Sequence, residues 1–283
     1  MKVMTAATRP YAILGSPIEH SKSPTLHNHG FAACGIDSVF LAFDAQDETI
    51  GDVMAALRTL NIAGGSVTMP VKRSIIPHLD GLSREAELIG AVNVYKNEDG
   101  RFIGYNTDGM GLVMLLEERG FAYKGKKVVM SGAGGAGRAV AIQMALSGAA
   151  EVVIFDMMEE SAKDVADIIN RNIETCTSRA YPSDETQVLK ELADGASVYV
   201  DCTPLGMTPN EDTTMIHDFS SLSPELAVVD IVYAPLKTKL LKLAEEHGHP
   251  ISNGIDMFFY QGAKAFKIWT GEELPIDKIK PEM

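Results

Sequence analysis

A glycine-rich segment between two apolar strands constrains this chain more than any other feature. Residues 128–131 are short, apolar and valine-rich, which predicts a buried strand, and GAGGAG follows at 132–137. An amphipathic helical pattern comes next, and a second apolar strand over 151–155 leads into Asp156. A strand, a glycine turn, a helix and a strand in this order predict a parallel βαβ unit.

The glycines occupy the positions of a dinucleotide-binding motif. In G-x-G-x-x-G, Gly132 allows a tight turn, Gly134 lets the backbone approach a pyrophosphate, and Gly137 lets the helix pack on the sheet. The N–H groups at the helix start then face the phosphates. The acidic residue that this motif requires is present at Asp156. The predicted cofactor loop consists of Gly132, Ala133, Gly134, Gly135, Ala136 and Gly137.

Composition and charge narrow the class of protein. The chain has 283 residues, of which 46% are hydrophobic and 22% charged, as in a globular protein of one large or two ordinary domains. No apolar run reaches the ~20 residues of a membrane helix, and residues 1–15 lack a signal-peptide pattern, so we expect a cytoplasmic protein. A net charge of −13 argues against nucleic acid and anionic membranes as partners.

The rest of the chain alternates between predicted strands and helices, which predicts parallel sheets covered by helices. The turn signal at 97–100 predicts a hairpin. Strands are expected at 11–15, 39–43, 63–68, 91–95, 101–105, 178–180, 197–202 and 227–231. Further helices are expected at 25–34, 48–60, 83–89, 106–118, 161–171, 185–193, 238–247 and 254–270.

Polar side chains of the first half gather just after predicted strands, where open α/β sheets bind ligands. Each has an ordinary local explanation as well: turn chemistry for the serines, a surface charge for the lysine, and helix capping for the aspartate. These residues are Ser21, Ser23, Thr68, Lys72, Asn93, Asn106 and Asp108.

Seven segments, in order along nearly the whole chain, resemble the shikimate dehydrogenase family, which includes a quinate/shikimate dehydrogenase branch. The resemblance implies two α/β domains with a deep cleft between them: a substrate-binding domain of residues 1–108 plus 254–283, and a Rossmann-like NAD-binding domain of residues 109–253. The segments are GSPIEHSKSPTLHN (15–28), SVTMPVK (66–72), GAVN (90–93), GYNTDG (104–109), GAGGAG (132–137), CTPLGM (202–207) and QGAKAF (261–266).

The resemblance also implies a reaction, the reversible oxidation of the ring 3-hydroxyl of shikimate or quinate to 3-dehydroshikimate or 3-dehydroquinate by hydride transfer. Lys72 and Asp108 would form the catalytic pair that handles the hydroxyl proton. An aspartate favours the charged form of a neighbouring lysine, whereas burial disfavours it, so the lysine can be a base, an acid or an electrostatic stabiliser.

Other residues of the resembling segments would bind the two ligands. The substrate would contact Ser21, Ser23, Thr68, Lys72, Asn93, Asp108, Gln261 and Tyr233. Beyond the glycine loop and Asp156, the cofactor would contact Thr203, Gly254 and Met257.

The residues after the second strand of the βαβ unit bear on the choice of cofactor. Family members that use NADP have Asn-Arg-Thr or similar there, whereas this chain has DMMEE at 156–160 and no cation before Lys163. A carboxylate can bind ribose hydroxyls and repels a 2′-phosphate. The sequence therefore predicts a preference for NAD over NADP and an oxidative role. The alternative is that Asp156 only caps the following helix.

Three other functions stay open at this point: an NADP-dependent biosynthetic enzyme of the family, a dinucleotide-binding regulator without turnover, and another two-domain dehydrogenase such as a methylene-tetrahydrofolate dehydrogenase. Lys72 and Asp108 favour an enzyme over a regulator. Histidines two residues apart, at 27/29 and 247/249, do not face each other on a helix, so we expect no metal. The expected partners are a hydroxylated ring carboxylate and a possible second copy of the chain.

Overall fold

A computed structural model describes residues 4–282 and divides into two compact units. Unit 1 comprises Met1–Thr107 and Gln261–Met283, and unit 2 comprises Asp108–Tyr260. The second junction lies inside helix α9 (Ile255–Thr270), which continues from one unit into the other, and not at 253/254 as expected from the sequence. Residues 1–3 and 283 of the expected substrate-binding domain lie outside the described residues.

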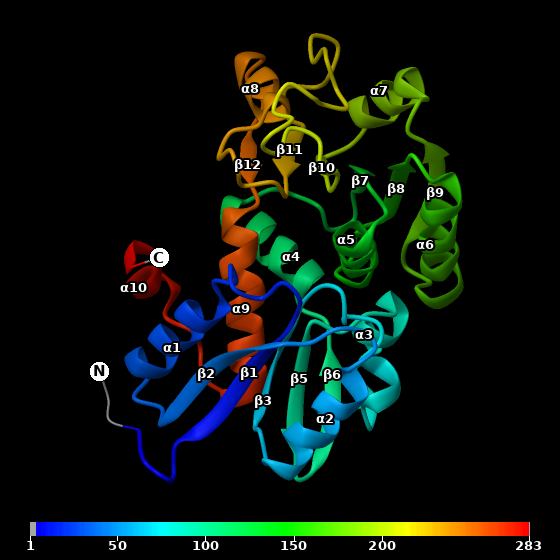
Figure 1. The fold of residues 1–283 in the computed structure, drawn as a ribbon. Coiled ribbons are helices and arrows are strands. Elements are labelled where there is room, and N and C mark those ends of the chain that lie inside the picture. Colours follow the sequence, from blue (N-terminus) through cyan, green and yellow to red (C-terminus); the bar gives the residue numbers. More distant parts are fainter. Residues whose placement is uncertain (1–3, 283) are drawn as a thin grey trace. The chain divides into compact units, whose positions relative to one another are not determined.

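Unit 1 is built on a six-stranded mixed sheet with the order β2-β1-β3-β5-β6-β4 (Figure 1). β1 pairs in parallel with β2 and β3, whereas β5 is antiparallel to both β3 and β6. Asp99 and Gly100 both have positive φ (53° and 90°), which is the conformation of a two-residue hairpin turn, so β6 runs back along β5. The strands are β1 (Arg9–Gly15), β2 (Ser38–Asp44), β3 (Gly64–Val67), β4 (Gly81–Leu82), β5 (Val94–Glu98) and β6 (Arg101–Tyr105).

This hairpin confirms the one expected from the turn signal at 97–100 and makes the sheet of unit 1 mixed. Its first strand begins at Val94, three residues later than the predicted 91–95. Val92 has a partner outside the hairpin, since its N–H donates to the Lys72 carbonyl (2.8 Å), whereas the Asn93 N–H still donates to Tyr105 at the end of β6 (3.0 Å).

Helices cover both faces of this sheet. One face packs Leu14, Tyr95 and Phe102 against Met54 and Leu57. The other face carries an aromatic cluster contributed by Tyr11, Phe31, Phe40, Phe266 and Trp269. The helical segments are α1 (Ser23–Ala33), α2 (Ile50–Thr59), η1 (Ile76–His78), α3 (Arg84–Ile89), α10 (Ile276–Ile279) and η2 (Lys280–Glu282).

Unit 2 contains a six-stranded sheet with the order β12-β11-β10-β7-β8-β9, in which every pairing is parallel (Figure 1). This confirms the predicted βαβ unit. The chain fills one side of β7 first and then the other, so β7 and β10 form the switch point at which such sheets bind ligands. The strands are β7 (Lys127–Ser131), β8 (Glu151–Asp156), β9 (Thr177–Pro182), β10 (Val198–Asp201), β11 (Ala227–Asp230) and β12 (Ile251–Asn253).

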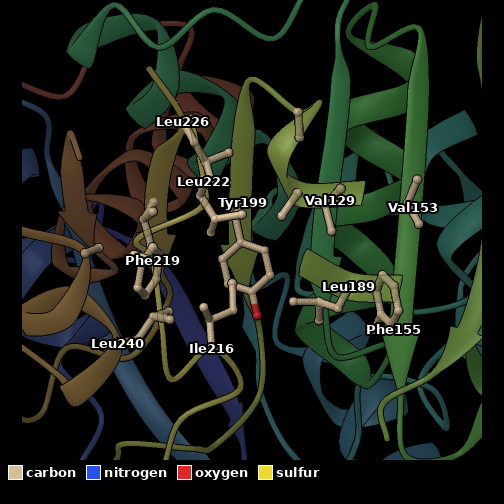
Figure 2. Packing of buried hydrophobic residues seen from close by; sticks show 14 of the residues in the cluster. Val129, Val153, Phe155, Leu189, Tyr199, Ile216, Phe219, Leu222, Leu226 and Leu240 are labelled. Atoms are coloured by element: carbon tan, nitrogen blue, oxygen red, sulfur yellow. The ribbon is translucent and has the colours of Figure 1, made fainter. Parts of the chain in front are cut away.

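One face of this sheet packs on a large apolar cluster (Figure 2). Strand residues such as Val129, Phe155 and Tyr199 meet Leu189 of α7 and Leu240 of α8 there. No helix within residues 4–282 has the length and apolar character needed to span a bilayer. The helices of unit 2 are α4 (Asp108–Arg119), α5 (Gly135–Leu146), α6 (Glu159–Asn172), α7 (Thr186–Asp194) and α8 (Lys239–Glu246).

Candidate active site

The glycine loop of unit 2 connects β7 to α5, and two of its glycines are required by the fold itself. Gly132 has a φ of +96°, and a Cβ there would lie 2.8 Å from the Cys202 backbone. A Cβ at Gly137 would overlap the Gly132 carbonyl oxygen. Any side chain at either position would therefore push the turn, the helix and the neighbouring loop apart.

Gly134 and Gly135 have a different reason to be glycine. A Cβ at either position would meet no atom within 4 Å, so packing does not demand these glycines. Gly134 is the N-cap of α5 and has no side chain to cap the helix. The first N–H groups of the helix are therefore left to face this open space. A helix N-terminus with room beside it fits the pyrophosphate of a dinucleotide.

Asp156 ends β8 and links the glycine loop to the next helix. One carboxylate oxygen accepts the Ala133 N–H (2.6 Å) and the other accepts the Met158 N–H (2.7 Å) at the N-cap of α6. Each carboxylate oxygen thus has a hydrogen-bond partner in the backbone of unit 2.

A pocket of about 410 Å³ lies at the ends of β10 and β11. One wall comes from the loop after β10 and includes Thr203, and the other comes from the loop after β11 and includes Tyr233. Gly254 follows β12, and a Cβ there would overlap the Ile231 carbonyl. The full lining is Cys202, Thr203, Pro204, Met207, Ile231, Val232, Tyr233 and Ala234.

Two buried aspartates, to which no role was assigned from the sequence, directly precede the pocket-lining residues Cys202 and Ile231. Asp201 and Asp230 are register partners at the ends of β10 and β11, and each is 1% exposed. Burial and the neighbouring Asp230 raise the pKa of Asp201 to about 7, and burial raises the pKa of Asp230 to about 6. The available signal was an acidic residue at the end of each apolar strand.

Thr68, Lys72 and Asn93 gather at one end of the central strands of the unit 1 sheet. The Thr68 side chain packs against Gly15, so the ends of β1 and β3 lie side by side, and the Thr68 N–H donates to the Leu14 carbonyl (2.8 Å). Lys72 follows four residues later, and its carbonyl accepts the Val92 N–H (2.8 Å). This pairing brings the Lys72 backbone beside the residue that precedes Asn93.

Asn93 is the centre of a buried amide network in unit 1. Its Oδ1 accepts the Thr107 N–H (2.8 Å), and its Nδ2 donates to Thr107 Oγ1 (3.0 Å) and to Gln261 Oε1 (3.5 Å). Asn93 is 3% exposed and Thr107 is 1% exposed. The structure therefore brings together Asn93 and Gln261, which were both predicted to bind the substrate. It adds Thr107, to which no role was assigned from the sequence.

The two predicted serines lie at the start of α1. The Ser23 N–H donates to Ser21 Oγ (3.3 Å), which is the turn chemistry considered from the sequence. A hydroxyl oxygen that accepts this bond still has its own proton to donate. Asp108 is the first residue of α4 and belongs to unit 2, as do Tyr233, which is 45% exposed, and Met257.

A glycine loop at a helix start, on a doubly wound parallel sheet, is the architecture of a dinucleotide-binding protein. The relatives of this chain make it an NAD(P)-dependent oxidoreductase that acts on a CH–OH group. Comparison with known proteins identifies the family. The chain belongs to the shikimate dehydrogenase family. Residues 13–95 match its profile "Shikimate dehydrogenase substrate binding domain", and residues 254–283 match "Shikimate 5'-dehydrogenase C-terminal domain".

Relatives and solved structures agree on the family. A protein from Alkaliphilus metalliredigens, named shikimate dehydrogenase (NADP(+)), is 46% identical over 273 residues, which cover 96% of this chain and 95% of the relative. The fold matches shikimate 5-dehydrogenase from Listeria monocytogenes in complex with shikimate and NAD (TM-score 0.97, 40% identity, 100% and 98% of the two chains). It also matches a shikimate dehydrogenase in complex with NADP+ (TM-score 0.85, 39% identity, 99% and 96%).

These comparisons correct the prediction about the cofactor. Relatives from Alkaliphilus metalliredigens, Streptococcus uberis and Listeria monocytogenes are all named as NADP(+) enzymes, so the expected preference for NAD over NADP is wrong. The physical reason lies in Asp156, whose two oxygens both accept backbone N–H groups. An acidic residue at this position is accounted for by the loop and by the start of α6, as in the capping alternative, and does not by itself indicate NAD.

Proposed function

We propose that this chain catalyses the reversible oxidation of the ring 3-hydroxyl of shikimate to 3-dehydroshikimate, with NADP as the hydride acceptor. The observation that carries the proposal is the buried Asn93–Thr107–Gln261 network. It lies at the end of the central strands where Thr68 and Lys72 also lie. Buried amides with fixed orientation suit a ligand that has several ring hydroxyls, because each hydroxyl needs both donors and acceptors.

The side chains of unit 1 supply the donors and acceptors that substrate binding requires. The hydroxyls of Ser21 and Ser23 donate to the ring carboxylate, which a strongly acidic chain can hold only through local donors. Thr68, Asn93 and Gln261 bind the ring hydroxyls. In this assignment Tyr233 contributes from the loop after β11.

The cofactor would be held by the glycine loop 132–137 and by Thr203, Gly254 and Met257. When bound, the dinucleotide would supply the acceptor for the hydride that leaves the carbinol carbon. The alcohol loses one hydride and one proton and becomes a ketone. Lys72 and Asp108 would take up the proton or stabilise the alkoxide as it develops, and the negative charge of an aspartate favours the charged, stabilising form of a lysine.

Initial rates with shikimate and quinate, each with NADP and with NAD, test the proposal. We expect dehydrogenation of shikimate with NADP. Turnover of quinate but not of shikimate would assign the chain to the quinate branch. An absence of turnover with both acids, in a protein that still binds the dinucleotide, would favour the regulator instead.

The role of Lys72 makes a separate prediction. We expect Lys72→Ala to lower kcat by about 10²- to 10⁴-fold, the usual contribution of a positioned proton-transfer group, with a much smaller change in KM. Arg73→Ala, the loss of an exposed cation at the next position, is the matched control and should leave both constants nearly unchanged. Intact turnover in Lys72→Ala would rule out a catalytic role for this lysine.

A further inference from the structure

The two walls of the 410 Å³ pocket are each anchored by one buried carboxylate. Asp201 Oδ1 accepts both the N–H (2.8 Å) and the hydroxyl (2.6 Å) of Thr203, in the first wall. Asp230 Oδ1 accepts the Val232 N–H (2.9 Å), in the second wall, and its Oδ2 accepts the Thr238 hydroxyl (2.6 Å) at the start of α8. The conformation of both loops therefore depends on these two side chains.

The two aspartates are also neighbours in the sheet. Asp201 and Asp230 are register partners in adjacent parallel strands, whose spacing is about 4.8 Å, and paired residues project to the same face. That face is the one where Tyr199 and Val228, two residues earlier in each strand, enter the apolar cluster (Figure 2 labels Tyr199). Two carboxylates in contact with an apolar core cannot both ionise without a large cost.

Among residues 4–281, the groups that face this pair provide no positive charge. They are Tyr199 and Cys202, whose pKa values are raised well above the ordinary range by burial and by the two carboxylates, so that both stay neutral. The polar neighbours Thr203, Thr238 and the Val232 N–H are not titratable near neutrality. Any change of charge in this part of unit 2 near neutral pH therefore arises in the pair itself.

We propose that Asp201 and Asp230 share one proton and act as positioning residues that hold the two walls of the cofactor pocket together. The shared proton belongs on Asp201 Oδ2, because both hydrogen bonds from Thr203 end on Oδ1. Loss of the proton places two negative charges side by side and separates the loop that carries Thr203 from the loop that carries Tyr233. Contact between the loops is already close, since a Cβ at Gly206 would lie 3.0 Å from the Thr238 Cβ.

The inference rests on the proposed function only in naming the occupant of the pocket, and the variant that tests it is Asp201→Asn. Its amide oxygen can accept both Thr203 donors, and its NH2 group donates permanently to Asp230, in place of the shared proton. We expect the Kd of NADP for the wild type to rise by roughly tenfold between about pH 6.5 and 8.5, and that of Asp201→Asn to rise far less. The cofactor's own phosphate titrates near pH 6 but contributes equally to both proteins.

A second readout needs no cofactor. Both pKa values are raised by folding, so the native state keeps a proton that the unfolded chain releases above about pH 4, and wild-type stability should fall as pH rises toward about 7. The folding equilibrium constant should change by up to about tenfold per pH unit in that window, and Asp201→Asn should show a smaller slope. Asp167→Asn, at an exposed position of α6, is the control and should behave as the wild type.

Two outcomes decide the inference. Equal pH dependence of wild type and Asp201→Asn, in both NADP affinity and stability, would overturn it. Asp201→Ala, which loses both anchoring bonds, should bind NADP weakly at every pH, and normal affinity in that variant would overturn the positioning role. If the wild type binds no dinucleotide, the proposed function fails, while the stability measurement still tests the shared proton.

Discussion

At the scale of single residues, Asp156 shows how one side chain can have a role that its sequence context does not reveal. Its carboxylate accepts hydrogen bonds from the N–H groups of Ala133 and Met158. It also occupies the position at which the dinucleotide-binding motif places the acidic residue that binds the ribose. A bound 2′-phosphate would be repelled by that charge. The proposed use of NADP therefore requires that the two N–H donors compensate this charge.

Substitution of this residue separates charge from structure. We expect Asp156→Asn to raise the ratio of kcat/KM for NADP to that for NAD by about tenfold, because the change removes one charge near the phosphate. It should also destabilise the fold by about 1 to 3 kcal/mol, since an amide cannot accept both N–H bonds. Kinetics with both cofactors and urea unfolding measure these effects. Glu160→Gln, the same loss of charge on an exposed side chain, is the control, and an equal response in it would contradict the prediction.

The same residue marks a limit of sequence-based prediction. The acidic residue at the end of the second strand was correctly located, but periodicity does not say whether its oxygens face a ribose or a backbone N–H. Asp201 and Asp230 illustrate the limit from the other side, because each looks like an ordinary strand end until the parallel register places them together. Side-chain direction and cross-strand pairing depend on tertiary packing, which local patterns do not contain.

At the scale of elements, the turn from β7 to α5 was predictable because each part of it obeys local rules. The buried strand, the glycines and the helix start were all located from the sequence, and the helices expected at 48–60 and 161–171 are present with ends shifted by a residue or two. Strands β4 and β12 were missed, since two- and three-residue strands carry no periodicity. The hairpin turn was recognised, but its register placed β5 three residues later than expected.

The glycine loop makes a prediction at this scale that compares two positions of one turn. Gly134→Ala should leave stability nearly unchanged, because its Cβ meets no protein atom, but it should weaken dinucleotide binding by about tenfold or more by filling the space beside the helix start. Gly137→Ala should destabilise unit 2 by about 3 kcal/mol or more, because its Cβ overlaps a backbone carbonyl. Thermal unfolding and calorimetric binding distinguish the two. Equal effects of both changes on stability would contradict this reading of the loop.

At the scale of the whole molecule, the chain forms unit 1 from two distant segments with unit 2 inserted between them. Asn93 and Gln261 are 168 residues apart, yet their amides meet inside unit 1. Nothing in composition or periodicity predicts such a contact, and only the resemblance of several ordered segments to one family placed both residues in one site. A local reading of the sequence thus locates strands, turns and motifs, whereas the family pattern is what joins them across the chain.

The aromatic cluster of unit 1 makes this organisation measurable, because Trp269 is the chain's only tryptophan and lies buried there. Its Nε1 donates to the Tyr95 carbonyl (3.0 Å), and its ring contacts Tyr11 and Phe40 with centroids 5.5 Å away. Fluorescence of Trp269 therefore reports the unfolding of unit 1, while circular dichroism reports both units. A ligand stabilises only the native state that binds it.

We expect shikimate at about 100 times its Kd to raise the stability seen by Trp269 fluorescence by about 2.7 kcal/mol, with or without cofactor. NADP alone should stabilise mainly unit 2, because the glycine loop that binds it lies there. Its effect should therefore appear in the circular dichroism transition more than in the fluorescence of Trp269. Asn93→Ala should abolish the shift caused by shikimate while leaving the shift caused by NADP intact, which separates a lost site from a lost fold. A shift of the Trp269 transition by NADP alone as large as that by shikimate would contradict the assignment of the main NADP contacts to unit 2 and of the main shikimate donors to unit 1.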